Sequence, residues 1–236
     1  MDNKSKHLLV GCSFTDPLWQ KEIPWSVQYS ATQPCYIVAK VGMGIKGICT
    51  EALYYLRNLK DVSKLIVILP TLWRLDVEMD VETYLCNSLV DLLFSDGTPC
   101  VQQHAKRKWI SSGGLNYDSS AEQARIFDLL YKHQGFLVIA KEHFRALQNL
   151  LIYCKIHNID YEISAIQDPM SQLTGLDYIK SEIEELLDQV EYSNWFKFNG
   201  TFIDKFLNHQ HHPNTIEHKK LCDYILTKEN YHGKTI

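Results

Sequence analysis

His7-Leu8-Leu9-Val10-Gly11-Cys12-Ser13-Phe14-Thr15-Asp16 is the stretch of sequence that decides the fold. Its apolar run, which ends at Gly11, predicts a buried strand followed by a tight turn. Thr15 or Asp16 is placed to cap a helix after that turn. In open α/β folds, such a turn lies at the carboxyl end of the sheet, where these folds bind their ligands. Ser13 is therefore the candidate nucleophile, and it needs a histidine as its base.

Two other interpretations of this turn stay open. Serine between a strand and a helix is a common helix cap, so the Ser13 hydroxyl could have that role alone. Cys12 is a rival nucleophile. Because neighbouring side chains on a turn point in different directions, Cys12 and Ser13 should not face the same site. The other interpretation of Cys12 is a small apolar side chain that fills space in the core.

Apolar runs alternate with helical periodicities along the rest of the chain. The alternation predicts a parallel sheet with crossover helices, arranged as a three-layer α/β/α sandwich. Strands are expected at 7–11, 35–40, 64–69 and 159–166, with a weaker pattern for a fifth at 194–198. Helices are expected at 47–60, 81–94, 119–132, 136–157, 176–190 and 215–228.

Length and composition predict one domain over residues 1–236. The chain has 236 residues and 45% apolar residues, which is enough for one sizeable core. Turn-forming residues gather between 95 and 120, where the alternation stops, and this segment predicts a long loop or cap.

Charge and hydropathy exclude several classes of function. The net charge is −4 and the longest basic run is Lys106-Arg107-Lys108, so nucleic acid is not an expected partner. No apolar run approaches the roughly 20 residues of a membrane span. The first residues lack a signal-peptide pattern, which predicts a cytoplasmic protein, or one released by lysis or carried on a particle. The seven cysteines lack Cys-x-x-Cys spacing and are expected to be reduced thiols.

A group of histidines near the other end of the sequence contains the candidate base. His212 is followed by Pro213 and Asn214 and then by helical spacing, which favours it over His211. His218 is expected in the first turn of that helix. A metal site here would need further ligands elsewhere. The candidates, none at ligand spacing, are His104, His133, His143, His157, Asp76 and Asp80. No metal and no cofactor is therefore expected.

Three segments resemble the conserved blocks of the SGNH/GDSL hydrolases. The stretch from Gly11 to Asp16 is similar to their first block, Gly-Asp-Ser-x-Thr-Asp. Val41-Gly42-Met43-Gly44-Ile45-Lys46-Gly47 is similar to the second, and His212-Pro213-Asn214 with His218 is similar to the last. The segments follow the family's order and span nearly the whole chain.

The resemblance implies a flavodoxin-like fold with a five-stranded, mostly parallel sheet, and serine esterase activity without a cofactor. It assigns Ser13 as the nucleophile and His212 as the base. The N–H groups of Ser13, Gly42 and Gly44 would form the oxyanion hole. Gly42 and Gly44 have a second interpretation, a tight turn with positive φ.

The chain departs from the family pattern at two positions. His209 occupies the place of the catalytic aspartate, and Asp204 is the nearest acid upstream, so the orienting group is either displaced or replaced by a backbone carbonyl in a Ser–His dyad. The oxyanion asparagine is absent from the segment after the third strand, where Thr71 or Arg74 could donate instead. One missing donor typically costs about two to three powers of ten in turnover. The chain therefore resembles a divergent member.

Trp73 and Arg74 are expected to line the substrate site, because they follow a strand of the same sheet. Trp73 or Trp19 could stack on a sugar ring, and Arg74 could bind a carboxylate, phosphate or sugar hydroxyl. A packed indole, and an ion pair of Arg74 with Asp16 or Asp76, are the alternatives. The expected substrate is a small acyl ester, acetyl on a carbohydrate, as in similar enzymes of phages and polysaccharide loci.

Two other functions stay open at this stage. The loss of the aspartate and the asparagine is compatible with an inactive SGNH-like module that binds glycans or has a structural role. A metal-dependent hydrolase built on the histidine group is the third interpretation.

Overall fold

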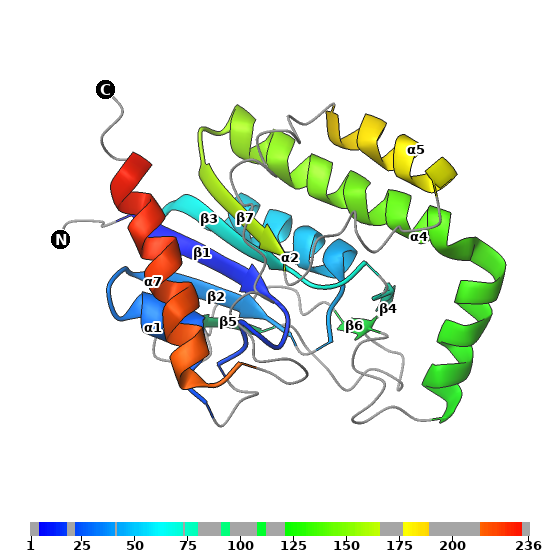
Figure 1. Cartoon of the computed structure of the whole chain (residues 1–236), viewed down its shortest axis with the longest axis horizontal. Helices are drawn as coiled ribbons and strands as arrows, with labels where there is room; N and C mark the ends of the chain where they lie inside the picture. The colour runs from blue at the N-terminus through cyan, green and yellow to red at the C-terminus, as the bar shows by residue number, and fades with distance from the viewer. Residues whose placement is uncertain are drawn as a thin grey trace.

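Figure 1 shows the computed structural model, which describes residues 5–17, 22–40, 42–72, 74–79, 91–94, 108–111, 121–165, 177–188 and 213–232. The described residues form an α/β fold in which a central parallel sheet is packed against helices.

Four parallel strands make up most of the main sheet. Their order is β2 (Cys35–Ala39), β1 (Lys6–Gly11), β3 (Val62–Leu69) and β7 (Asp160–Ala165). The short β5 (Asp91–Phe94) pairs antiparallel with β2 at the edge, and β4 (Asp76–Met79) pairs antiparallel with β6 (Lys108–Ser111) in a separate sheet. The described helices are α1 (Trp25–Ser30), α2 (Ile45–Asn58), α4 (Ala121–Ile156), α5 (Asp177–Asp188) and α7 (Thr215–His232).

The parallel strands form because each is a short apolar run that helices can cover on both faces. Val10 lies opposite Val38 on one side and Val67 on the other. All three side chains are at most 1% exposed. A strand buried on both faces has continuous apolar residues instead of alternating ones, which is the pattern of the first and third strands.

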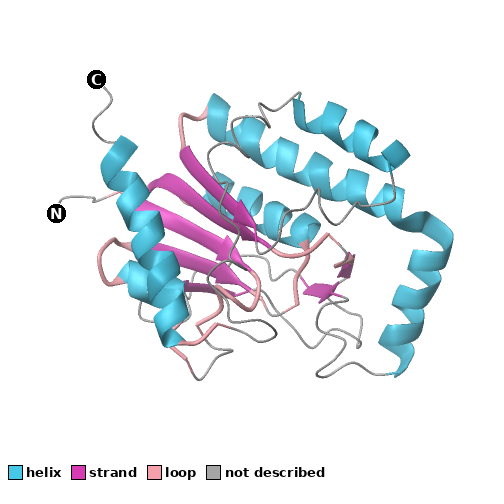
Figure 2. Ribbon diagram, in the orientation of Figure 1, coloured by secondary structure: helices cyan, strands magenta, loops and turns pink. Residues whose placement is uncertain are grey.

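Crossover handedness decides which helices cover which face of the sheet. The connection from β1 to β2 contains α1, and it runs in the opposite direction across the sheet from the connections that contain α2 and α4. Because such crossovers are right-handed, the reversal places α1 on one face and α2 and α4 on the other. α7 packs with α1 and α2 packs with α4, so helices lie on both sides of the strands in Figure 2.

The strand order also locates the expected ligand-binding edge. β1 and β3 are neighbours, but the chain leaves them toward opposite sides of the sheet. Ligands of open α/β sheets bind outside the carboxyl ends of strands at this kind of reversal. The turns that follow β1 and β3 are therefore the first place to look for a site.

Most sequence-based elements are confirmed to within a few residues. The strands expected at 7–11, 35–40, 64–69 and 159–166 are β1, β2, β3 and β7. The helices expected at 119–132 and 136–157 are the two parts of α4, which Gly135 separates with φ 72° and ψ 155°. The expected strand at 194–198 lies outside the described residues.

The helix expected at 81–94 is wrong at its end, because residues 91–94 form β5. Four residues are too few for periodicity to distinguish a strand from a helix. The backbone of Tyr36–Ala39 offers pairing partners along the open edge of β2, and that tertiary contact decides the conformation. Residues 81–90 lie outside the described residues.

Three further elements were not expected from the sequence. Residues 95–120 were predicted to be a loop or cap, yet Lys108–Ser111 form β6 against β4. α1 is a single short helix that begins after Pro24 with no side-chain cap. Each of these elements is too short for a periodic signal, so its neighbours in space determine it.

Candidate active site

Ser13 lies on a tight turn immediately after β1. The carbonyl of Cys12 accepts hydrogen bonds from the N–H groups of Thr15, at 2.9 Å, and Asp16, at 3.2 Å. Gly11 is required before this turn, because a Cβ there would lie 2.1 Å from Thr15 Oγ1. The Ser13 side chain is 2% exposed. The sequence therefore places a hydroxyl at the carboxyl end of the sheet, as predicted.

Thr15 holds this turn against α1 and does not cap a helix. Its carbonyl accepts a hydrogen bond from Ser26 Oγ at 2.6 Å, and its hydroxyl accepts one from the indole Nε1 of Trp25 at 3.3 Å. All three residues are buried. The prediction that Thr15 or Asp16 opens a helix is wrong, since the next described helix begins at Trp25.

Gly42 forms the corresponding turn after β2, the strand beside β1. Its φ of 75° is in the left-handed region, which favours glycine, so the expected positive-φ turn is confirmed at this residue. The Lys40 N–H donates to the Gly11 carbonyl at 3.3 Å, and the Met43 N–H donates to the Lys40 carbonyl at 3.2 Å. These bonds join the Gly42 turn to the end of β1.

Gly44 has a different role from the one implied by the family resemblance. Its φ is −90°, and its N–H donates to Asp76 Oδ1 at 2.7 Å. Because that N–H is already bonded to a buried carboxylate, Gly44 is not available as an oxyanion donor in this conformation. Gly42 and Ser13 are then the backbone donors left for that role.

Asp76 and His143 together cap the start of α2. Asp76 Oδ2 accepts a second hydrogen bond from the Gly47 N–H at 2.8 Å, and His143 Nδ1 accepts one from the Lys46 N–H at 3.1 Å. Helix starts have N–H groups without partners inside the helix, and Gly44 has no side chain to supply one. The caps therefore come from β4 and α4. From the sequence, His143 was a candidate metal ligand, and Asp76 was a candidate metal ligand or an ion-pair partner of Arg74; the signal for their true contacts was the missing capping residue at 44.

Thr71 and Arg74 follow β3, on the other side of β1. Arg74 N–H donates to the Thr71 carbonyl at 3.4 Å, and both side chains are half-buried. Arg74 Nη1 is buried and has no hydrogen-bond acceptor among the described residues. A buried guanidinium nitrogen in this position is suited to an oxygen of a ligand. Trp73, the expected sugar-stacking residue, lies outside the described residues.

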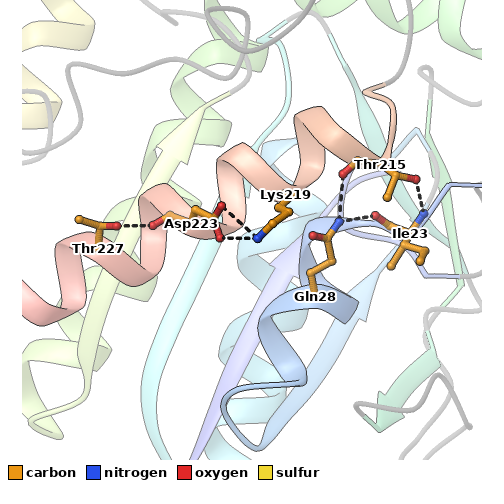
Figure 3. Close-up of polar contacts among 6 residues, drawn as sticks. All are labelled: Ile23, Gln28, Thr215, Lys219, Asp223 and Thr227. Carbon is orange, nitrogen blue, oxygen red and sulfur yellow. Dashed lines mark hydrogen bonds and ion pairs between the residues drawn. The ribbon is translucent and has the colours of Figure 1, made fainter.

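The start of α7 lies against the start of α1, although about 190 residues of sequence separate them (Figure 3). Gln28 Nε2 donates to the Ile23 carbonyl at 2.8 Å and to the Thr215 carbonyl at 3.2 Å. The Ile23 N–H donates to Thr215 Oγ1 at 3.4 Å, and Glu22 accepts from the Thr215 N–H and hydroxyl. Hydrogen bonds from Thr215 lower the pKa of the Glu22 carboxyl.

A capping box fixes the first turn of α7. The Asn214 side chain accepts from the Glu217 N–H at 3.0 Å, and Glu217 accepts from the Asn214 N–H at 2.9 Å. Pro213 is buried next to it. His218 lies in this first turn, as expected, and is 0% exposed. The hydrogen bonds of Thr215 with Glu22 and Ile23 place the adjacent pair Pro213-Asn214 close to the residues just before α1.

Several predicted site residues lie outside the described part of the chain. They are His212, His211, His209, Asp204 and Trp73. The structure thus brings together Ser13, Gly42, Thr71 and Arg74 at one edge of the sheet, and the imidazole base stays a prediction. Within the described ranges, no group of three or more histidine, cysteine, aspartate or glutamate side chains is placed to hold a metal ion.

Comparisons with known proteins found no matching family model and no matching curated protein. As for membrane contact, none of the helices that the structure describes is both long and apolar enough to cross a bilayer.

Proposed function

We propose that the protein is a serine ester hydrolase of the SGNH/GDSL type, which removes a small acyl group such as acetyl from a carbohydrate ester. The position of Ser13 carries this proposal. Ser13 is on a tight turn at the carboxyl end of β1. β1 lies between β2, which leads to Gly42, and β3, which leads to Thr71. The strand order β2-β1-β3-β7 is compatible with a flavodoxin-like sandwich, a fold that binds its ligand at this edge, and it supports the proposal.

The start of α7 supports His212 as the base. The hydrogen bonds of Thr215 with Ile23, Gln28 and Glu22 hold this helix end beside the start of α1, the helix that follows β1 in the chain. His212 precedes the buried Pro213 by one residue. The anchored Pro213 is thus the described neighbour of the residue that we propose as the base.

The reaction that we propose is acyl transfer to water. Ser13 Oγ attacks the ester carbonyl carbon while His212 accepts its proton, and the Ser13 and Gly42 N–H groups stabilise the oxyanion. When the carbon–oxygen bond to the alcohol breaks, His212 protonates that alcohol. Water then attacks the acyl group on Ser13 and gives a proton to His212. The proton passes to Ser13 as the acid leaves.

The remaining residues are assigned to substrate binding and to orienting the base. Arg74, through the buried Nη1, binds an oxygen of the substrate, and Thr71 is the second candidate donor. Trp73 stacks on the sugar ring. His209 and Asp204 stay the candidates for orienting His212, beside a backbone carbonyl.

Labelling with a fluorophosphonate probe tests the proposal. We expect the wild-type protein to be tagged at Ser13, with no tagging in Ser13→Ala and severe slowing in His212→Ala. Ser30→Ala is the matched control, because Ser30 is the last residue of α1, where its Oγ donates to the Val27 carbonyl. Since Ser13 is 2% exposed, the reaction also requires that the residues over it admit the probe.

Hydrolysis of an aryl acetate is the second measurement. Absence of both labelling and hydrolysis from about pH 6 to about pH 9, where an imidazole base should act, would contradict the proposal. The inactive glycan-binding module would then be the better hypothesis. Activity that survives Ser13→Ala but is lost on adding a chelator would instead favour the metal-dependent hydrolase.

A further inference from the structure

We propose that Asp76 is a positioning residue for the oxyanion hole: its carboxylate binds the N–H groups of Gly44 and Gly47, and thereby fixes the Gly42 turn beside Ser13. We call these two hydrogen bonds the Asp76 bridge. The loop-fixing part follows from contacts in the structure, and its catalytic consequence rests on the proposed function.

The geometry of the Asp76 bridge makes it a strong contact. One carboxylate oxygen lies 2.7 Å from the Gly44 nitrogen, and the other lies 2.8 Å from the Gly47 nitrogen. Both are charge-assisted hydrogen bonds, and they place the carboxylate at the positive end of the α2 dipole. Asp76 is 2% exposed, so little water competes for these donors.

The glycines at 44 and 47 are needed to admit this carboxylate. A Cβ at position 44 would lie 2.3 Å from the Arg74 carbonyl and 2.7 Å from Asp76 Oδ2. A Cβ at position 47 would lie 3.0 Å from Asp76 Oδ2 and 2.9 Å from Met43 Cγ. The absence of side chains at both positions therefore has a physical cause that is separate from oxyanion binding.

Short connections transmit the position of Gly44 to Gly42. On one side, the Lys40 N–H bonds to the Gly11 carbonyl at the end of β1. On the other side, the Asp76 carboxylate holds Gly44. Met43, which joins Gly42 to Gly44, is 1% exposed. Gly42 is the turn of this doubly anchored loop. A displacement of about 1 Å in a catalytic group can cost about 100-fold in rate, so loss of one anchor should reach the chemistry.

The position of Asp76 is itself set by the second sheet. Asp76 is the first residue of β4, and it pairs with Ser111 of β6. The second sheet thus presents the carboxylate to the start of α2. His143 binds the N–H of Lys46, whereas the N–H of Gly44, next to the Gly42 turn, is bound by Asp76.

The test compares Asp76→Asn with Asp61→Asn. The Asp61 carboxylate also accepts hydrogen bonds, from Tyr36 and Lys6, but at the opposite end of the strands from Ser13. For aryl acetate hydrolysis we expect kcat to fall about 100-fold in Asp76→Asn with KM little changed. Binding of a boronic acid, which forms a tetrahedral adduct on Ser13, should weaken in parallel. We expect neither change in Asp61→Asn.

Amide hydrogen exchange gives a readout that does not need activity. We expect the N–H groups of Gly42, Gly44 and Gly47 to exchange faster in Asp76→Asn than in wild type or Asp61→Asn. If Asp76→Asn does not fold, Gly47→Ala serves instead, because its Cβ presses on the carboxylate without removing the charge. The expected effects have the same direction and a smaller size.

The outcomes separate the two hypotheses. Unchanged exchange in both variants overturns the loop-fixing part, and a wild-type kcat in a variant with faster exchange overturns the catalytic part. If wild-type protein fails to label with fluorophosphonate, the proposed function falls first, and the catalytic part falls with it. Faster exchange would then show that Asp76 fixes the loop for some other purpose.

Discussion

His143 is a buried imidazole that stays neutral because of its surroundings. Burial lowers its pKa from the ordinary value of 6.5, and this effect outweighs the opposing influence of Asp76, the Arg74 carbonyl and Glu142; the Lys46 charge acts in the same direction as burial. Neutrality suits its contact, since Nδ1 must be unprotonated to accept the Lys46 N–H. Protonation at Nδ1 would break one of the caps of α2.

We expect this single residue to make the fold sensitive to mild acid. Because the pKa is lower in the folded protein than in the unfolded chain, the unfolded state binds more protons as the pH falls. The contribution of His143 to stability is complete above about pH 6.5. It is lost between that pH and the lowered pKa, with a limiting slope of about 1.4 kcal/mol per pH unit.

Urea unfolding at a series of pH values measures this effect in wild type and in His143→Asn. The asparagine carbonyl can accept the Lys46 N–H without titrating, so we expect a shallower loss of the free energy of unfolding below pH 6.5. His157→Asn is the control, because His157 is exposed and packs on Tyr153. Equal slopes in all three proteins would contradict the assignment.

At the scale of elements, two helices near the site begin in opposite ways. α7 has a local capping box, Asn214 and Glu217, three residues apart in sequence. α2 begins at Ile45, after Gly44 as its N-cap, and takes its caps from Asp76, 32 residues from Gly44, and from His143, 97 residues from Lys46. A local cap can form early and alone, whereas the start of α2 depends on β4 and α4 being in place.

α4 contains the other element-scale feature, a break at Gly135. Figure 1 shows the helix changing direction along its length. The φ of 72° with ψ of 155° lies in a region that is essentially restricted to glycine, and a Cβ there would meet no atom within 4 Å. Conformation, and not space, is therefore the reason for glycine at this position.

We expect Gly135→Ala to destabilise the fold by about 1–3 kcal/mol, the typical cost of such backbone strain. This sign is opposite to the usual one, since alanine in a helix is normally favoured over glycine by about 1 kcal/mol. Thermal and urea unfolding measure the difference, with the exposed Gln134→Ala as the control. A stabilised Gly135→Ala would mean that the two halves of α4 join as a straight helix.

For the molecule as a whole, the reactivity of the buried thiols measures how readily the core opens. The five described cysteines, Cys12, Cys35, Cys49, Cys154 and Cys222, form no disulfide and are buried. Burial raises the pKa of the Cys49 thiol and raises that of Cys154 to about 12. Since the thiolate is the reactive form, both features protect these residues.

We expect a Cys86→Ser, Cys100→Ser variant to react slowly with a disulfide reagent when folded, and to expose five thiols in urea. The thiols of the folded protein can react only when the core opens. Their reaction rate should therefore be at least about a thousandfold lower than that of the unfolded protein. The same variant in denaturant is the control. A rapid reaction at Cys12 would instead show that the surroundings of Ser13 open readily.

Local patterns were enough to predict β1, β2, β3 and β7, because each is an apolar run whose burial needs no particular partner. The same holds for the Ser13 turn, where Gly11 and the polar residues after it act over a few positions, and for α7 with its own cap. The edge that carries Ser13 was predicted from the rule that open α/β sheets bind ligands at the carboxyl ends of their strands, whereas the strand order is a finding of the structure.

Contacts between distant residues determined the remainder. β4, β5 and β6 are four-residue strands whose conformation comes from the strand beside them. The acceptor of the Gly44 N–H is Asp76, 32 residues away, and only folding brings the two together. Whether a backbone donor faces a substrate or a buried carboxylate is a matter of position in space, which periodicity and motif spacing do not encode.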